Sequence, residues 1–131
     1  MSPTIDVRSL NDLIEFDVAN KVRKRIFITD KLEMELVCYE AGQSTVEHHH
    51  VGQDEIFMIL EGRGTITIGS EAVRVGPGSL VYAPADIKHG IEPDRESRMV
   101  MVFVKAPGRS SRPGRAAKAK NAEAAAAAAG Q

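Results

Sequence analysis

The sequence contains almost no cysteine and no long apolar run. Cys38 is the single cysteine among 131 residues, so no disulfide can form within the chain. It lies in the apolar-patterned stretch LEMELVCYE, where a thiol typically packs as a small hydrophobe, and we expect a reducing, cytoplasmic environment. No 18 apolar residues follow one another, and residues 1–16 lack a basic start followed by an apolar core, so we expect neither a membrane span nor a secretory signal.

Positive charge is scarce in most of the chain and concentrated at its end. Residues 1–104 carry a net charge of −6, whereas residues 105–131 carry +5. The end of the chain reads KAPGRSSRPGRAAKAKNAEAAAAAAGQ and has no large apolar residue that could anchor it in a core. We therefore predict one domain over residues 1–105 and a disordered, basic, Ala-rich tail over residues 106–131. A nucleic-acid or acidic partner of this tail is an alternative that we do not favour.

Long amphipathic helices are also lacking, because the apolar residues recur with a period of two. Short runs rich in Val, Ile, Thr, Phe and Tyr end at Gly, Pro or Asp, namely RIFIT, MELVCYEAG, EIFMILEG, GTITIG, AVRVG, SLVYAP and RMVMVFV. These runs predict seven or more strands and an all-β sandwich or barrel. The stretch SLNDLIEF predicts one short helical turn. Residues 56–60 and 99–104 are apolar on both strand faces, so we expect a second sheet, the N-terminal segment or a second subunit of a homodimer to cover them.

Three consecutive histidines occur in the stretch EHHHVGQDEIF. If a strand continues through His50, then His48 and His50 lie on one face and His49 on the other, because side chains alternate along a strand. A hairpin before the next run brings the Glu55 carboxylate back towards the two imidazoles. Three such groups can share a metal ion. For the histidines alone, a solvated and idle cluster in a loop is the alternative interpretation.

The spacing around these histidines reproduces a known motif. Gly42, His48, His50, Glu55 and Gly62 follow one another as G-x5-H-x-H-x4-E-x6-G, without a gap. In this respect the chain resembles the cupin superfamily, whose first motif has this spacing.

A second stretch, GPGSLVYAPADIKHGIEP, resembles the second cupin motif, G-x5-P-x-G-x2-H. Gly78, Pro84 and His89 stand at the matching positions. Asp86 stands where the family usually has Gly, and Pro93 stands where a less constant Asn ends the motif. Neither departure removes a metal ligand, but each alters the turn beside the site. Residues 63–77 fit the short spacing between the motifs of compact microbial cupins.

The resemblance covers residues 20–104 and implies a small single-domain cupin, a double-stranded β-helix or jelly-roll barrel. It implies one divalent transition metal held by His48, His50, Glu55 and His89. Three imidazoles and one carboxylate suit Mn, Fe, Co, Ni, Cu or Zn better than Ca. Asp54 is the alternative acidic ligand, but Glu55 keeps the six-residue distance to Gly62.

The function that the resemblance implies is less specific, because cupins host many reactions. We expect a metal-dependent oxidoreductase of dioxygenase type that acts on a small organic substrate. A non-catalytic module that binds or senses a small molecule, or a metal-dependent isomerase or lyase, is the alternative. Strand parity and position suggest a partly apolar substrate pocket, with candidate lining residues Phe57, Ile59, Tyr82, Met101 and Phe103. Apart from the metal ligands, no catalytic residue is identified.

Overall fold

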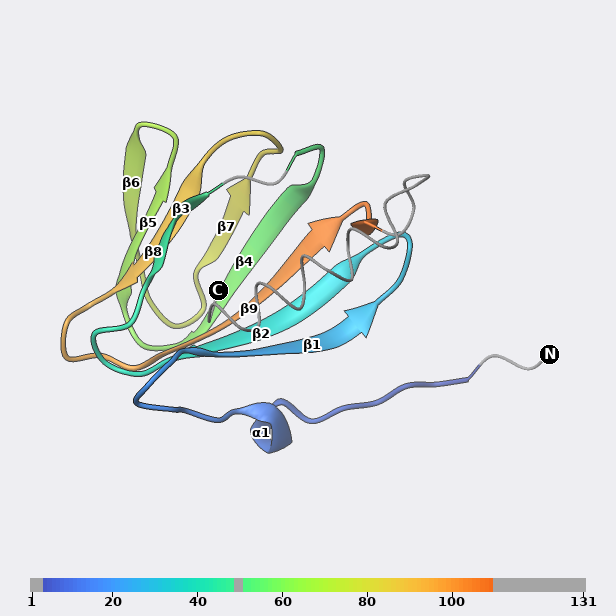
Figure 1. Ribbon diagram of the computed structural model, residues 1–131, viewed down its shortest axis with the longest axis horizontal. Coiled ribbons are helices and arrows are strands. Elements are labelled where there is room, and N and C mark those ends of the chain that lie inside the picture. The colour runs from blue at the N-terminus through green and yellow to red at the C-terminus, as the bar shows by residue number, and fades with distance from the viewer. Residues whose placement is uncertain (1–3, 49–50, 110–131) are drawn as a thin grey trace.

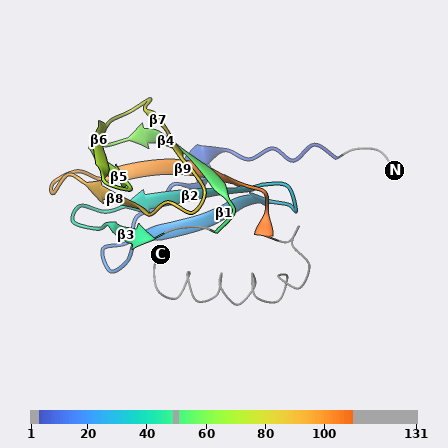
Figure 2. The same cartoon turned by 90° about the horizontal axis from the view of Figure 1, so that it is seen from above.

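The residues that the computed structural model describes, 4–48 and 51–109, form nine strands and one short helix. Figures 1 and 2 show two antiparallel sheets. The five-stranded sheet has the order β1-β2-β9-β4-β7, with β1 at Val22–Ile28, β2 at Glu33–Tyr39, β4 at Asp54–Glu61, β7 at Leu80–Ala83 and β9 at Met99–Ala106. The four-stranded sheet has the order β3-β8-β5-β6, with β3 at Thr45–His48, β5 at Gly64–Ile68, β6 at Glu71–Val75 and β8 at His89–Pro93. The prediction of an all-β jelly-roll is confirmed.

Seven of the nine strands agree with the predicted apolar runs, and β3 lies in the stretch that was expected to form a strand leading into the histidines. β8, which begins with His89, was not among those runs, because HGIEP holds Gly, Pro and Glu and lacks the alternation of a half-buried strand. It nevertheless lies between β3 and β5 and pairs with both. The predicted helical turn is α1 at Leu10–Leu13. No helix within the described ranges is long and apolar enough to cross a membrane.

The apolar residues form two clusters on opposite faces of the five-stranded sheet. The first lies between the sheets and draws on both, with Val37, Tyr39, Phe57, Ile59, Ile66, Val75, Ala83, Ile91, Met99, Met101 and Phe103. The second consists of Ile26, Leu36, Cys38, Val100 and Val102 on the outer face, and apolar side chains of residues 10–16 pack against it. The N-terminal segment therefore covers part of the outer face, as one of the predicted alternatives requires, and the Cys38 thiol is packed inside this cluster.

The outer face is apolar but exposed over the remaining strands. Ile56 and Met58 of β4 are paired in register with Tyr82 and Leu80 of β7. Their exposed fractions range from 36% for Met58 to 69% for Leu80. Of the described residues that belong to the second cluster or pack against it, only Leu60 lies on β4 or β7. This surface, Ile56, Met58, Leu80 and Tyr82, is called the outer β4–β7 face below.

The end of the domain lies beyond the predicted boundary at residue 105. Ala106 is the last residue of β9, the backbone N–H of Arg109 donates to Glu33 Oε2 at 2.7 Å, and Gln53 Nε2 donates to the Pro107 carbonyl at 2.8 Å. Residues 106–109 are thus held against the barrel, because they satisfy the buried polar side chains of Glu33 and Gln53. The remainder of the predicted tail lies outside the described residues.

Candidate metal and ligand site

The alternation of β4 decides which of its side chains enter the barrel. Glu55, Phe57 and Ile59 are buried, whereas Asp54, Ile56 and Met58 are exposed. Glu55 therefore points inward and Asp54 outward, where its Oδ1 accepts a hydrogen bond from the backbone N–H of Ala85 at 3.0 Å. Of the two acidic residues that the sequence offers, the structure brings Glu55 to the interior.

Glu55 meets His89 and His48 at the place where the two sheets face each other. His89 Nε2 lies 2.9 Å from Glu55 Oε2, and both side chains are at most 3% exposed. Within the four-stranded sheet His48 of β3 is the register partner of His89 of β8, and their ring centroids are 4.6 Å apart. Three strands, β3, β4 and β8, thus bring three of the four predicted metal ligands together. The fourth, His50, lies outside the described residues, as does His49.

The backbone orients both imidazoles in the same way. Nδ1 of His48 lies 3.0 Å from the carbonyl of Val46, and Nδ1 of His89 lies 3.4 Å from the carbonyl of Ile87. A carbonyl only accepts, so Nδ1 donates in each ring, which leaves the lone pair of a neutral His48 ring on Nε2. Burial also lowers the pKa of the His48 imidazole, which favours the neutral form. Metal-binding histidines commonly have this arrangement, with the second nitrogen donating to a carbonyl.

The donor chemistry fits a transition metal, but the described residues do not complete a site. Among residues 4–48 and 51–109, no group of three or more His, Cys, Asp and Glu side chains could hold a metal ion as arranged. Two neutral imidazoles and one carboxylate are nonetheless the N and O donors that Mn, Fe, Co, Ni, Cu and Zn accept. The residues therefore fit such an ion in chemistry, and His48, Glu55 and His89 are the described residues that would hold it.

A small cavity of about 30 Å³ opens beside these three residues. Of the five predicted lining residues, Phe57, Met101 and Phe103 do line it. Ile59 is fully buried in the inner cluster and does not reach the cavity. Tyr82 belongs to the outer β4–β7 face, where it is 57% exposed, because its parity on β7 matches that of Ile56 rather than that of Glu55.

Sequence reasoning missed three polar residues of the cavity, Arg23, Tyr39 and Thr45. The hydroxyl groups of Tyr39 and Thr45 are hydrogen-bonded at 2.8 Å, and burial raises the pKa of the Tyr39 phenol. Both side chains thus enter the cavity as neutral, mutually oriented hydroxyls. Tyr39 ends an apolar run and Arg23 precedes one, so only a correct register for β1 and β2 could have identified them.

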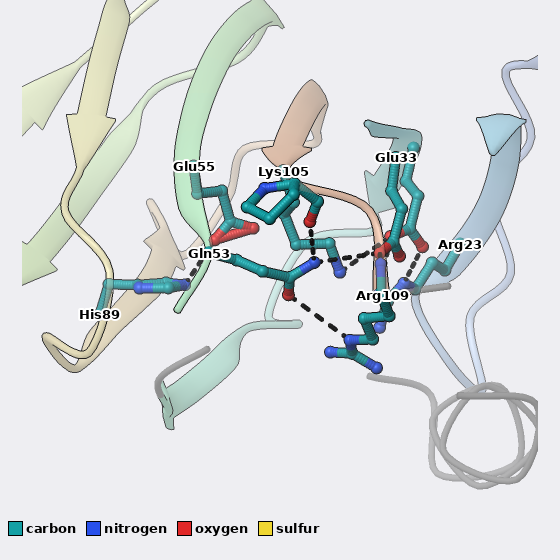
Figure 3. Close-up of polar contacts among 9 residues, drawn as sticks. Arg23, Glu33, Gln53, Glu55, His89, Lys105 and Arg109 are labelled. Atoms are coloured by element: carbon teal, nitrogen blue, oxygen red, sulfur yellow. Dashed lines mark hydrogen bonds and ion pairs between the residues drawn. The ribbon is translucent and has the colours of Figure 1, made fainter. Parts of the chain in front are cut away.

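A buried charged network adjoins the cavity (Figure 3). Arg23 donates to both oxygens of Glu35, from Nε at 2.7 Å and from Nη2 at 3.1 Å, and Lys105 Nζ lies 3.0 Å from Glu35 Oε2. Burial lowers the pKa of the Lys105 ammonium, and the neighbouring Glu35 charge opposes this effect. In the sequence, Glu35 and Lys105 stand out as charges at inward positions of otherwise apolar strands, which is the signal that could have identified the network.

The turn before His89 shows why the second motif usually has glycine at residue 86. Asp86 has φ = 68°, a conformation that few residues other than glycine adopt and that aspartate tolerates better than most. Its Oδ1 accepts a hydrogen bond from the backbone N–H of Gly52 at 3.0 Å. The carboxylate thus ties the turn that precedes His89 to the loop between β3 and β4, both of which border the site.

Comparisons with known proteins agree with this fold. A family model described as "Cupin domain" matches residues 35–105. An uncharacterized protein from Streptomyces coelicolor is 35% identical over 72 residues, which are 55% of this chain and 68% of that protein. A crystal structure of a protein from Thermus thermophilus has a TM-score of 0.74 and 25% sequence identity, and the match covers 79% of this chain and 98% of that protein.

A further relative has a stated activity. Acireductone dioxygenase from Bacillus subtilis is 35% identical over 69 residues. These residues are 47% of this chain and 38% of the dioxygenase, so the chain spans about two fifths of that enzyme's length.

Proposed function

This chain belongs to the cupin domain family, and we propose that it is a metal-dependent cupin of dioxygenase type that acts on a small organic substrate. One observation carries the proposal, namely the meeting of His89 Nε2 and Glu55 Oε2 at 2.9 Å beside a small cavity. The similarity to acireductone dioxygenase over 69 residues supports the type of reaction.

The metal would be one divalent transition ion per chain, held by His48, Glu55, His89 and His50. When bound, it would supply Lewis acidity and positions for exogenous ligands. Because Nδ1 of His48 and His89 contacts the carbonyls of Val46 and Ile87, Nε2 is the nitrogen of each ring that would bind the ion. The carboxylate of Glu55 would balance part of the charge of the ion.

The chain's own residues would bind and orient the substrate. Phe57, Met101 and Phe103 form an apolar wall that excludes water from the ligand. The hydroxyls of Tyr39 and Thr45 provide a hydrogen-bonded pair that can donate to, or accept from, a polar group of the substrate. All five side chains line the cavity.

Metal analysis and oxygen uptake together test the proposal. The purified protein is expected to contain about one equivalent of Mn, Fe, Co, Ni, Cu or Zn per chain by elemental analysis. Oxygen consumption is then screened with small diketones, catechols, flavonoids and thiols. A metal-replete protein that consumes no oxygen with any of them, yet binds one tightly, would favour the non-catalytic sensing module. A protein that binds no transition metal would contradict the proposal.

The isomerase or lyase alternative gains support from one side chain. Tyr39 places a hydroxyl in the cavity, whereas Glu61 and Tyr82 are exposed on the surface. A metal-dependent isomerisation would proceed without oxygen. Turnover under anaerobic conditions that is lost in Tyr39→Phe would identify it.

The homodimer and the cytoplasmic location that the sequence predicts remain part of the proposal. The outer β4–β7 face supports the homodimer, because Ile56, Met58, Leu80 and Tyr82 form a contiguous exposed apolar surface. The buried thiol of Cys38 is compatible with a reducing compartment. Light scattering at several protein concentrations would give the oligomeric state directly.

A further inference from the structure

The N-terminal arm, residues 4–8, turns its polar side towards the barrel. Its sequence TIDVR alternates with a period of two, so Ile5 and Val7 share one side of the extended chain. Asp6 and Arg8 share the other side. The Arg8 guanidinium donates to a backbone carbonyl of β1 at 2.6 Å, and it also donates to both oxygens of the Asp6 carboxylate, at 3.1 and 3.0 Å. The polar side of the arm is therefore the side that is held against the barrel.

The apolar side of the arm faces solvent. Ile5 is 85% exposed and Val7 is 82% exposed. Figures 1 and 2 both show the arm running away from the strands. A single exposed valine is ordinary on a protein surface, but a pair in strand alternation on one side of an anchored segment is typical of a surface that packs against another. Contact with a further apolar surface would bury this pair and stabilise the arm.

The outer β4–β7 face provides an apolar surface with the same spacing. Residues two apart on an extended chain are separated by about 7 Å and point to the same side. Ile5 and Val7 have this separation. So do the two residues that β4 contributes to the face and the two that β7 contributes, and these four lie side by side in register. An extended arm laid along the strands would thus bring both of its apolar side chains onto the exposed apolar face.

The arm begins at the edge of the sheet opposite that face. Arg8 holds it to β1, with the guanidinium carbon 5.1 Å from the centroid of the Phe27 ring. Phe27 packs against the outer cluster, so the arm leaves the barrel on the outer side of the sheet. In the order β1-β2-β9-β4-β7, however, β4 is three strand spacings, about 14 Å, from β1. Figure 1 shows the arm on the side of β1 that is away from β7. While Arg8 holds it there, the arm does not cover the outer β4–β7 face of its own chain.

A second copy of the chain solves this geometry. When two outer faces are related by a two-fold axis parallel to the strands, β1 of one copy lies opposite β7 of the other, because the rotation reverses the strand order. The arm of each copy then lies beside the outer β4–β7 face of the other. A two-fold contact of this kind uses the same two surfaces twice, so both arms and both faces are buried together.

We propose that the protein dimerises by exchange of its N-terminal arms, with Ile5 and Val7 of each copy packed on the outer β4–β7 face of the other. The occupant of that face is a second copy of this chain, because one chain carries both halves of the contact. This inference rests on the homodimer of the proposed function, which it specifies, and it depends neither on the metal nor on the reaction.

The dissociation constant of the dimer provides the first test. Sedimentation of the full chain over a dilution series measures it, with and without a chelator. Ile5→Ser combined with Val7→Ser should weaken the dimer by about tenfold or more, since both apolar side chains of the arm are lost. Leu80→Ser on the face should weaken it as well. Adding Leu80→Ser to the arm variant should cost less than the two separate effects together, because both changes remove the same contact.

Val18→Ser is the matched control for the arm variant. Val18 is 86% exposed, as much as the apolar residues of the arm, but it lies outside the arm and the outer β4–β7 face. Its replacement should leave the dissociation constant unchanged. An equal weakening by Val18→Ser would show that any loss of exposed apolar surface has this effect, which contradicts a specific contact of the arm.

Cross-linking shows which chain the arm covers. The thiol of Cys38 is buried, so a short bismaleimide should not join wild-type chains. In the double variant Val7→Cys, Leu80→Cys, the same reagent should join the two introduced thiols between chains. Denaturing electrophoresis would then show a covalent dimer, and peptide mass analysis would show that residue 7 is linked to residue 80.

Three further results would overturn the proposal. A protein that is monomeric at every concentration would exclude the homodimer and the exchange together. A dimer that Leu80→Ser weakens but the arm variant does not would show that the faces associate without the arms, so that the homodimer stands and the exchange fails. A link between the two introduced thiols within one chain would show that the arm folds back onto its own barrel. Metal content and oxygen uptake test the rest of the proposed function separately.

Discussion

His89 Nε2 lies 2.9 Å from Glu55 Oε2 although the two residues belong to strands of different sheets, β8 and β4. Both side chains are almost completely buried. A carboxylate inside a protein is costly unless a charge or hydrogen bonds compensate it, so this contact marks a place where the barrel forgoes apolar packing. Such a place is a candidate functional site.

The first prediction concerns the acidic metal ligand. Glu55→Gln should lower the metal content to well below one ion per chain, because it removes the carboxylate charge at His89. Asp54→Asn is the matched control and should retain the metal, since Asp54 points outward and bonds to Ala85. Elemental analysis after dialysis measures both. Normal metal content in Glu55→Gln together with loss in Asp54→Asn would reverse the assignment.

The second prediction compares two glycines of the first motif, Gly42 and Gly62. Both have positive φ, +89° and +86°. A Cβ at Gly42 would meet nothing within 4 Å, whereas a Cβ at Gly62 would overlap the backbone carbonyl of Arg98. Gly42→Ala should therefore cost about 1 kcal/mol through backbone strain. Gly62→Ala should cost several times as much. Urea unfolding measures the free energy of unfolding of both variants. Equal losses would show that the close approach of Gly62 to Arg98 does not matter for stability.

The third prediction concerns the turn at Asp86. Asp86→Gly relieves the backbone but loses the hydrogen bond to Gly52, at a cost of about 1 kcal/mol. Asp86→Ala loses the bond and also forces alanine into φ = 68°, so it should be less stable by about another 1 kcal/mol. Asp86→Asn keeps an acceptor and tolerates this backbone, and should resemble the wild type. In thermal unfolding, the melting temperature should fall in the order wild type, Asp86→Asn, Asp86→Gly, Asp86→Ala. A different order would show that the contact with Gly52 does not contribute to stability.

The fourth prediction concerns the pH dependence of stability. Burial by itself raises the pKa of the Glu35 carboxyl, but Arg23 and Lys105 outweigh burial and hold the pKa below its usual value of 4.5. A carboxyl with a depressed folded-state pKa stabilises the fold above its unfolded-state pKa, and this contribution is lost as the pH falls through the folded-state value. The stability difference between wild type and Glu35→Gln should thus be constant near neutral pH and shrink below pH 4.5.

Chelator-treated protein should be used for this measurement, so that metal release does not contribute. Glu71→Gln serves as the control, because Glu71 is exposed on β6 and lies outside the network. A difference between wild type and Glu35→Gln that is the same in strong acid and at neutral pH would show that the ion pairs with Glu35 do not stabilise the fold.

The sequence predicts the barrel and the inward orientation of Glu55 well, because both depend on local alternation along single strands. Phe57 and Glu55 share a parity, and the structure buries both. The orientation of Tyr82 could not be predicted in this way, since its strand β7 carries no predicted metal ligand that would show which face points inward. Arg23 could not be found either, because its contact with Glu35 depends on the pairing of β1 with β2 and thus on contacts between separate parts of the chain.

The same limit applies to the strand that carries Glu55. β4 is apolar on both faces, so a shift by one residue would turn Asp54, Ile56 and Met58 inward and again present a carboxylate followed by two apolar side chains. Hydrophobicity therefore does not distinguish the two alignments of β4 with β9. Its ladder shifts between Ile59 and Glu61, and at Gly62 the chain passes so close to Arg98 that only glycine fits. Gly62, at the far end of β4, thus fixes the alignment of β4 with β9 and thereby determines that Glu55 rather than Asp54 reaches His89.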